Sequence, residues 1–215
     1  MYKIKKMKIT IFGATGTVGK QLVQQALFKA YNVVAFGRNV FTTDFPKDDN
    51  LELRQGALFD EEQVYNAITG SNAVLSVIGG SVDGSDKTRS LGIKNIIEQM
   101  NKAGIKRIIA LGGLGVLNAD ENTLLIDKDG YPPEFIPVGL EHKKAYEYLK
   151  ASNLDWTFVC SPNIINAGPT GDFVTNANYP PTPNNNKINA GDLALFMLNE
   201  LNKNEFLKQR VGISN

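Results

Sequence analysis

Cysteine, histidine and tryptophan each occur once in the 215 residues of this chain, and neither sign of charge is in excess. The single Cys160 excludes an internal disulfide, and it has no metal-ligating partner nearby in the sequence. No cluster of metal ligands, pair of catalytic carboxylates or Ser-His-Asp order stands out. With 23 basic and 22 acidic residues, the formal charge of +1 gives no indication of nucleic acid binding.

Long apolar runs are also missing. None approaches the roughly 18 to 20 residues that a membrane-spanning helix needs. Lysines at positions 3, 5, 6 and 8 precede an apolar run that is too short for a targeting signal. We therefore expect a cytoplasmic protein without a membrane partner, and the length favours one domain over residues 1–215.

The clearest motif is a glycine-rich turn between a short apolar strand and a helix. Gly13 permits a sharp turn, Gly16 admits a phosphate to the backbone, and Gly19 lets the helix pack on the strand. The exposed N–H groups and helix N-terminus of such a turn suit the pyrophosphate of a dinucleotide. The predicted cofactor contacts here are Gly13, Thr15, Gly16, Thr17, Val18 and Gly19.

About 20 residues beyond this turn, an apolar strand at 32–36 ends where an NAD-selective site would carry Asp or Glu for the ribose hydroxyl. Here the chain has Arg38, followed by Asn39. A guanidinium offers a fork to a phosphate and no acceptor to a hydroxyl. The sequence therefore favours NADP(H), with contacts from Arg38 and Asn39. NAD(H) with a solvated arginine at the strand end stays the alternative.

Apolar strands alternate with helices along most of the chain. Strands are expected at 9–12, 32–36, 51–58, 73–78, 107–111, 156–160 and near 211, and helices at 20–30, 60–68, 84–103, 138–151 and 190–201. Two irregular segments, 114–137 and 166–186, have the length of functional loops. Near-continuous apolar strands predict a parallel sheet covered on both faces, with a ligand at its carboxyl edge.

Bare strand ends extend the predicted site along that edge. Glycine pairs follow the fourth and fifth strands, and Pro162 and Asn163 follow the sixth. Glycine lets a ligand approach the backbone, although a simple turn would use it equally well. The cofactor contacts predicted here are Ile78, Gly79, Gly80, Gly112, Gly113 and Pro162, and Asn163 is expected to border the nicotinamide.

The whole pattern resembles the small atypical branch of the short-chain dehydrogenase/reductase superfamily, in particular its flavin reductase-like (biliverdin reductase B-like) and NmrA-like members. The likeness rests on the glycine turn, Gly37-Arg38-Asn39, the run 143–147 and the run 152–157, and it covers nearly the whole chain. It implies a Rossmann-type doubly wound parallel sheet in three α/β/α layers, with irregular C-terminal substrate loops.

Catalytic members of the superfamily use a Tyr, a Lys four residues later, and a Ser after the fifth strand. The resemblance places the Tyr at Gly139, its Lys at Lys143 and the Ser at Gly113, so two of the three side chains are absent. Tyr146 and Lys150 have the right spacing but lie too far along the helix. Lys143 is expected to contact the nicotinamide ribose, or else to lie on a solvated helix face.

Two further departures concern the ends of the cofactor. The family's Gly-Asp after the third strand is Gly56-Ala57 here, so the adenine is expected to meet Ala57 and the backbone of Leu58. A histidine after the sixth strand in related reductases is replaced by Asn163, which cannot act as an acid near neutral pH. We assign Lys143 and Asn163 as candidate catalytic residues, while His142, the only histidine, is expected at the surface.

Two functions follow from this pattern. One is hydride transfer from NADP(H) to a small conjugated acceptor such as a flavin or quinone, achieved mainly by positioning. The other is a non-catalytic NADP(H) sensor that acts through a protein partner, as NmrA-like members do. Chemistry on a nucleotide sugar is disfavoured because such relatives need the Tyr and a larger C-terminal domain. We expect a monomer or a small homo-oligomer.

Overall fold

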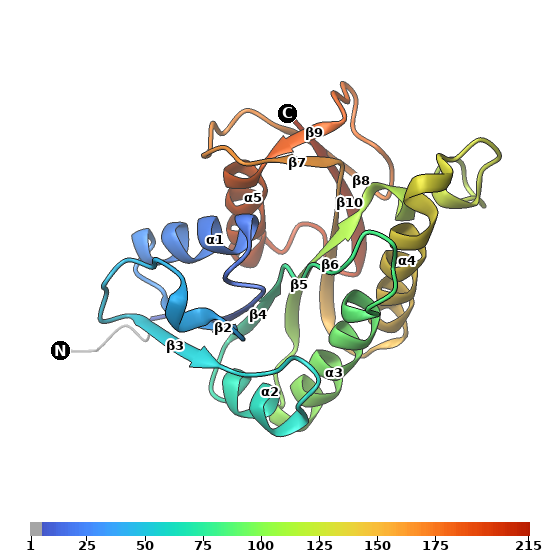
Figure 1. The fold of residues 1–215 in the computed structure, drawn as a ribbon. Helices are drawn as coiled ribbons and strands as arrows, with labels where there is room; N and C mark the ends of the chain where they lie inside the picture. The colour runs from blue at the N-terminus through green and yellow to red at the C-terminus, as the bar shows by residue number, and fades with distance from the viewer. Residues whose placement is uncertain (1–5) are drawn as a thin grey trace.

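The computed structural model describes residues 6–215; two lysines of the basic segment, Lys3 and Lys5, lie outside this range. Helices cover both faces of an eight-stranded sheet in the order β3-β2-β1-β4-β5-β6-β10-β8 (Figure 1). The strands are β1 (Lys8–Phe12), β2 (Asn32–Gly37), β3 (Leu51–Gln55), β4 (Ala73–Ser76), β5 (Arg107–Gly113), β6 (Asp155–Ser161), β8 (Val174–Ala177) and β10 (Gln209–Ser214). This order contains the 3-2-1-4-5-6 arrangement of a Rossmann-type sheet, which confirms the predicted fold class.

One strand departs from the predicted parallel sheet. All neighbouring strands pair in parallel except β8, which runs antiparallel to β10 at the edge of the sheet. Its four residues lie inside the segment 166–186 that we expected to be irregular. Pairing with β10 supplies its backbone hydrogen bonds, which no local pattern in the sequence indicates.

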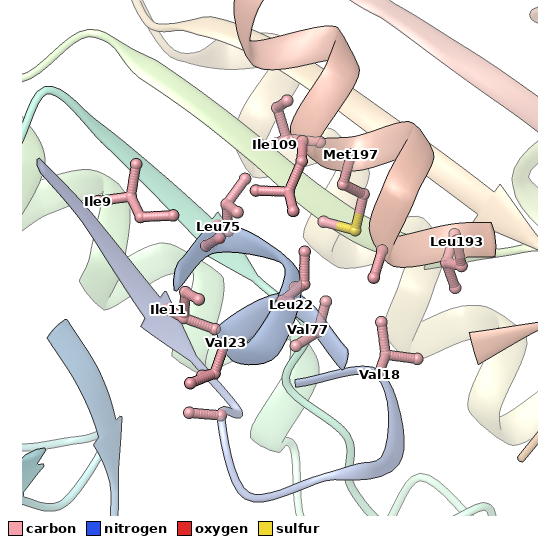
Figure 2. Packing of buried hydrophobic residues seen from close by; sticks show 14 of the residues in the cluster. Ile9, Ile11, Val18, Leu22, Val23, Leu75, Val77, Ile109, Leu193 and Met197 are labelled. Atoms are coloured by element: carbon pink, nitrogen blue, oxygen red, sulfur yellow. The ribbon is translucent and has the colours of Figure 1, made fainter. Parts of the chain in front are cut away.

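Two buried clusters hold the helices on the sheet. On one face lie α1 (Thr17–Phe28) and α5 (Ala190–Lys203), and on the other α2 (Glu61–Ile68), α3 (Thr88–Ala103) and α4 (Ile136–Ala151). Figure 2 shows the first cluster, in which Leu22 of α1 and Met197 of α5 pack over Ile11 and Leu75 of the central strands. Both faces are thus apolar, as near-continuous apolar strands require.

Helix α3 starts later than the sequence predicted, at Thr88 instead of residue 84. The preceding residues form a turn in which the Asp86 carboxylate accepts hydrogen bonds from the N–H groups of Ser81 and Thr88. Asp83 accepts from the N–H of Ser85 in the same way. Short acidic side chains that bind backbone N–H groups compete with the helix, and so the turn persists up to residue 87.

The two predicted long loops contain short ordered elements. The first carries the 3-10 turns η2 (Leu114–Val116), η3 (Leu125–Asp127) and η4 (Pro133–Phe135), and a further one, η1 (Val40–Thr42), follows β2. In the second, β7 (Asn163–Ile165) pairs with β9 (Lys187–Asn189) beside the start of α5 (Figure 1). None of the helices in residues 6–215 is long and apolar enough to cross a membrane.

A buried carboxylate fastens the second loop to α5. Asp192 accepts hydrogen bonds from the N–H groups of Thr170 and Gly171 and from the Thr170 hydroxyl, at 2.7 to 2.8 Å. Burial opposes ionisation of this carboxyl, but these bonds and one from Asn215 outweigh it and leave the Asp192 pKa below its usual value. The loop that follows β7 is therefore fixed to the scaffold.

Candidate functional site

The glycine turn between β1 and α1 has one face that the protein leaves open. Gly13 has φ +79°, and a Cβ there would lie 2.5 Å from the carbonyl oxygen of Val77. A Cβ on Gly19 would lie 2.1 Å from the carbonyl oxygen of Gly13. A Cβ on Gly16 would meet only that same oxygen, at 3.4 Å, which is ordinary contact. Gly13 and Gly19 are therefore required by packing, while Gly16 faces solvent.

Helix α1 begins beside Gly16 without a side-chain cap or an acidic residue in its first turn. The N–H groups of its first turn consequently have no intrahelical partner and present the positive end of the helix dipole. Thr17 is exposed, whereas the Val18 side chain is buried in the core, so that only the backbone of Val18 can meet a ligand. These residues fit the pyrophosphate of a dinucleotide.

The end of β2 carries a free cation. The Arg38 side chain is exposed and has no carboxylate partner within residues 6–215. Its carbonyl accepts a hydrogen bond from Gln55, and the neighbouring Asn39 opens the turn η1. Gly37 brings this strand end to the Thr15 side chain of the glycine turn, since a Cβ on Gly37 would lie 3.4 Å from the Thr15 methyl group. The two predicted cofactor segments are thus adjacent.

The adenine end, predicted at Ala57 and Leu58, is partly occupied by the protein itself. The Gln63 side chain accepts a hydrogen bond from the N–H of Ala57 at 2.8 Å. The Leu58 carbonyl accepts one from Asn95 at 2.9 Å. Strand β3 ends at Gln55, before the predicted end at residue 58, and Ala57 and Leu58 bond to these side chains instead of to a neighbouring strand.

Beyond β4, the loop that contains Gly79 and Gly80 is tied down by one arginine. Ile78 is buried, whereas both glycines are exposed. The Arg89 guanidinium donates to the carbonyl oxygens of Gly80 and Ser81 at 3.1 and 2.9 Å. A Cβ on Gly79 would meet nothing within 4 Å, whereas a Cβ on Gly80 would lie 2.7 Å from the Asp86 carboxylate. Gly79 is therefore open to a ligand, while Gly80 is packed by side chains from the following turn and α3.

His142 of α4 was expected at the surface, but it is half-buried, and its ring packs against the end of β5. A Cβ on Gly113 would lie 2.7 Å from His142 Cδ2 and 3.2 Å from Nε2, so the imidazole fills the space that a side chain at 113 would occupy. Gly112 is needed for a different reason, because a Cβ there would lie 2.3 Å from the Phe158 ring. Burial, with the Arg89 charge adding to it, lowers the pKa of His142 to about 3.

The helix position to which the resemblance assigns the tyrosine is filled from the loop before α4. A Cβ on Gly139 would lie 2.5 Å from Ile126 Cδ1 and 3.7 Å from the Tyr131 hydroxyl. That hydroxyl also lies 2.6 Å from the place of a Cβ on Gly115. The missing tyrosine is thus replaced by an aliphatic side chain and a phenol from the segment 114–135. The partly buried Tyr146 instead stacks against Phe158 of the core.

Lys143 is engaged with a carboxylate in this structure. Its Nζ lies 2.7 and 2.8 Å from the two carboxylate oxygens of Asp127. Both side chains are partly exposed. The sequence predicted that Lys143 would contact the ribose or lie in solvent, and it did not predict the ion pair with Asp127.

The end of β6 forms the opposite side of the edge. Pro162 is half-buried and Asn163 is exposed as the first residue of β7, where its N–H donates to the Asn186 carbonyl. Cys160 is buried, and burial raises the pKa of its thiol to about 12, so the thiol is unreactive near neutral pH.

Hollows elsewhere on the surface do not compete with this edge as the dinucleotide site. One of about 680 Å³ lies under the loop 43–50, and one of about 260 Å³ lies at the amino ends of the strands. Neither is lined by a predicted cofactor residue. In addition, no group of three or more metal-ligating side chains occurs in the described part of the chain.

Comparisons with known proteins agree with this assignment. A solved structure from Streptococcus pneumoniae, a candidate NADH-flavin reductase, is 27% identical, with a TM-score of 0.83 over 97% of this chain and 99% of that one. A candidate exported protein from Burkholderia pseudomallei is 30% identical, with a TM-score of 0.82 over 97% and 100%.

The first two curated relatives are longer than this chain, whereas YwnB of Bacillus subtilis, which is 24% identical over 96% of this chain, is covered over 98% of its own length. The photosystem II assembly factor Ycf39 of Guillardia theta is 27% identical over 70% of this chain and 45% of its own length. The chain spans between 45% and 64% of the first curated relatives that it matches. A family model described as NAD(P)H-binding matches residues 13–204, which include every strand end described above, and the chain belongs to this NAD(P)H-binding family.

Proposed function

We propose that this protein is an NADP(H)-dependent reductase that transfers hydride to a small conjugated acceptor such as a flavin or quinone. The observation that carries the proposal is the open face of Gly16 beside the uncapped start of α1, at the carboxyl edge of the sheet, where open α/β sheets bind ligands. Residues 1–215 would act as one NAD(P)-binding domain.

The proposed preference for NADP(H) rests on Arg38. Its guanidinium is exposed and unpaired within residues 6–215, and it follows β2 in the place where an acidic residue would serve NAD(H). A phosphate ester on the ribose would receive a charge-assisted pair of hydrogen bonds from this group. Thr15 and Asn39 flank the same position.

The bound dinucleotide supplies hydride, and the chain supplies position. Gly139 and Gly113 carry no acid, and the neutral His142 is not a source of protons at neutral pH. A flavin or quinone can accept hydride into its conjugated system and take one proton from water, which gives NADP⁺ and the two-electron-reduced acceptor. The Tyr131 phenol lies beside the Gly139 position, but burial raises its pKa and so makes it a weaker acid. An acceptor that takes its proton from water therefore suits this site better than an isolated ketone, whose reduction needs a proton delivered to its oxygen.

Lys143 and Asn163 are the side chains proposed to orient the reacting groups. Lys143 would exchange part of its pairing with Asp127 for the nicotinamide ribose hydroxyls. Asn163, exposed beside Pro162, would offer its amide to the nicotinamide or to the acceptor.

The test is steady-state oxidation of NADPH with FMN, riboflavin and menadione, alongside NADPH binding by calorimetry. We expect binding together with turnover of at least one acceptor. Measurable NADPH binding without turnover of any acceptor would overturn the reductase proposal.

That outcome would favour the second candidate, a non-catalytic NADP(H) sensor. The observation in its favour is the replacement of the tyrosine position by Gly139 and Ile126. A relative that is named an assembly factor supports it as well. Recovery of a specific partner from the source cell, gained or lost when NADP(H) is added, would support this function.

A further inference from the structure

The His142 imidazole is held in place by the elements around it. The preceding residue, Glu141, is buried and accepts hydrogen bonds from the Ser90 hydroxyl at 2.7 Å and from the Ser90 N–H at 3.3 Å, at the start of α3. Lys87 adds an ion pair to Glu141 at 3.4 Å. These contacts fix the first turns of α4 to α3. They therefore hold the His142 ring against Gly113.

The two ring nitrogens have different surroundings. Nδ1 is buried and has no hydrogen-bond partner among residues 6–215. Nε2 lies on the ring edge that faces Gly113 at the carboxyl end of β5. A buried N–H without an acceptor costs about 1 to 3 kcal/mol, so the proton belongs on Nε2. The neutral ring thus presents an N–H donor at the edge where the cofactor and acceptor are proposed to meet.

Building on the proposed reductase function, we propose that His142 is an acceptor-positioning residue, which donates one hydrogen bond from Nε2 to the carbonyl oxygen or ring nitrogen of the bound acceptor. It occupies the space of the family's serine side chain and replaces that side chain's hydroxyl donor with an imidazole donor. No proton leaves the ring. The bond orients the acceptor and stabilises the negative charge that develops on it as hydride arrives.

The chain offers a direct spectroscopic test because it contains one histidine. A ¹H–¹⁵N spectrum of the imidazole in the full chain will show a single neutral ring with its proton on Nε2. Its shifts should be constant from pH 5 to pH 8, and the Nε2 signal should move when oxidised FMN is added to the protein with NADP⁺. A ring that titrates near 6.5, carries its proton on Nδ1 or does not respond to FMN overturns the proposal.

Two substitutions separate hydrogen bonding from packing. His142→Phe keeps a ring of similar size without a donor, whereas His142→Gln keeps an N–H. We expect kcat/KM for FMN to fall about tenfold in H142F and clearly less in H142Q, with the NADPH Kd within twofold of the original in both. Equal losses in the two variants would show a packing effect and overturn the proposal.

Gly113→Ala tests the same contact from the other side. The added Cβ would lie 2.7 Å from the ring, so the imidazole must move and its signals must shift. Gly168→Ala is the matched control, because a Cβ there meets nothing within 4 Å. If the chain turns over no acceptor while FMN still moves the Nε2 signal, the reductase function fails and the contact stands. If the chain turns over FMN and H142F does so at the same rate, the reductase function stands and the role proposed for His142 fails.

Discussion

Lys143 and Asp127 form a close ion pair, in which the ammonium of α4 contacts both carboxylate oxygens of the turn η3 at 2.7 and 2.8 Å. The pair joins the helix position that the family resemblance assigns to the cofactor with the long segment between β5 and α4. Because both side chains are partly exposed, the pair contributes little to stability, and Lys143 can exchange partners at low cost.

Removal of Lys143 should therefore weaken cofactor binding and leave the fold intact. For Lys143→Ala, we expect the NADPH Kd to rise about tenfold and the Tm to change by less than about 2 °C. Lys144→Ala is the matched control, because Lys144 is exposed and contacts Glu147 and the Tyr148 ring of its own helix. Calorimetry and thermal unfolding provide both readouts. An unchanged Kd would place Lys143 outside the site.

Arg38→Glu should reverse the cofactor preference. The substitution removes the donor for the 2′-phosphate and introduces an acceptor for a ribose hydroxyl, so NADPH should bind at least tenfold more weakly and NADH more tightly. Lys106→Glu makes the same change of charge at the amino end of β5, where Lys106 is exposed, and should alter neither affinity. Equal weakening by both substitutions would indicate a general charge effect.

The glycine turn separates a binding residue from a packing residue. Gly16→Ala adds a Cβ at an ordinary 3.4 Å, so the protein should fold normally while NADPH binding falls at least tenfold. Gly19→Ala places its Cβ 2.1 Å from the Gly13 carbonyl oxygen and should lower the stability by about 2 to 4 kcal/mol. Urea unfolding and calorimetry distinguish the two. A stable Gly19→Ala protein would contradict the described turn.

Loss of the Glu141 carboxylate should destabilise the start of α3. Glu141→Ala removes the acceptor of the buried Ser90 N–H and leaves the Ser90 hydroxyl only the longer bond to the Lys87 carbonyl oxygen, which costs about 2 to 3 kcal/mol and lowers the Tm by about 4 to 12 °C. Glu141→Gln keeps an acceptor oxygen and should lose less. Equal destabilisation by both would mean that the charge beside Lys87 matters more than the hydrogen bonds.

Asp192 should make stability depend on pH on the acid side. Its pKa is depressed in the folded state, so its contribution is present above the unfolded value of about 3.9 and is lost as the pH falls through the folded value. Asp192→Asn should therefore be about 2 kcal/mol less stable at pH 7, and the gap from the original chain should narrow below about pH 4. Urea unfolding at each pH measures this difference. If the difference in unfolding free energy between the two chains stays constant from pH 7 to pH 3, the ionisation of Asp192 does not contribute to it.

The order of elements was predictable because it depends on local patterns. Apolar runs, the three glycines of the first turn and the alternation of strand and helix specify a Rossmann-type sheet, and most helix bounds agree within a few residues. The exceptions have local or long-range causes. The Asp86 turn shortens α3, and β8 is a strand only because β10 is present to pair with it.

The sequence by itself also determined which side chains the edge lacks, since glycine stands at positions 113 and 139 whatever the fold. Only the tertiary structure decided what fills those places. Ile126 reaches Gly139 from 13 residues away, and His142 reaches Gly113 from another layer of the molecule. Such contacts depend on how the segment 114–135 and helix α4 pack on the sheet, because packing brings together residues that no local periodicity relates.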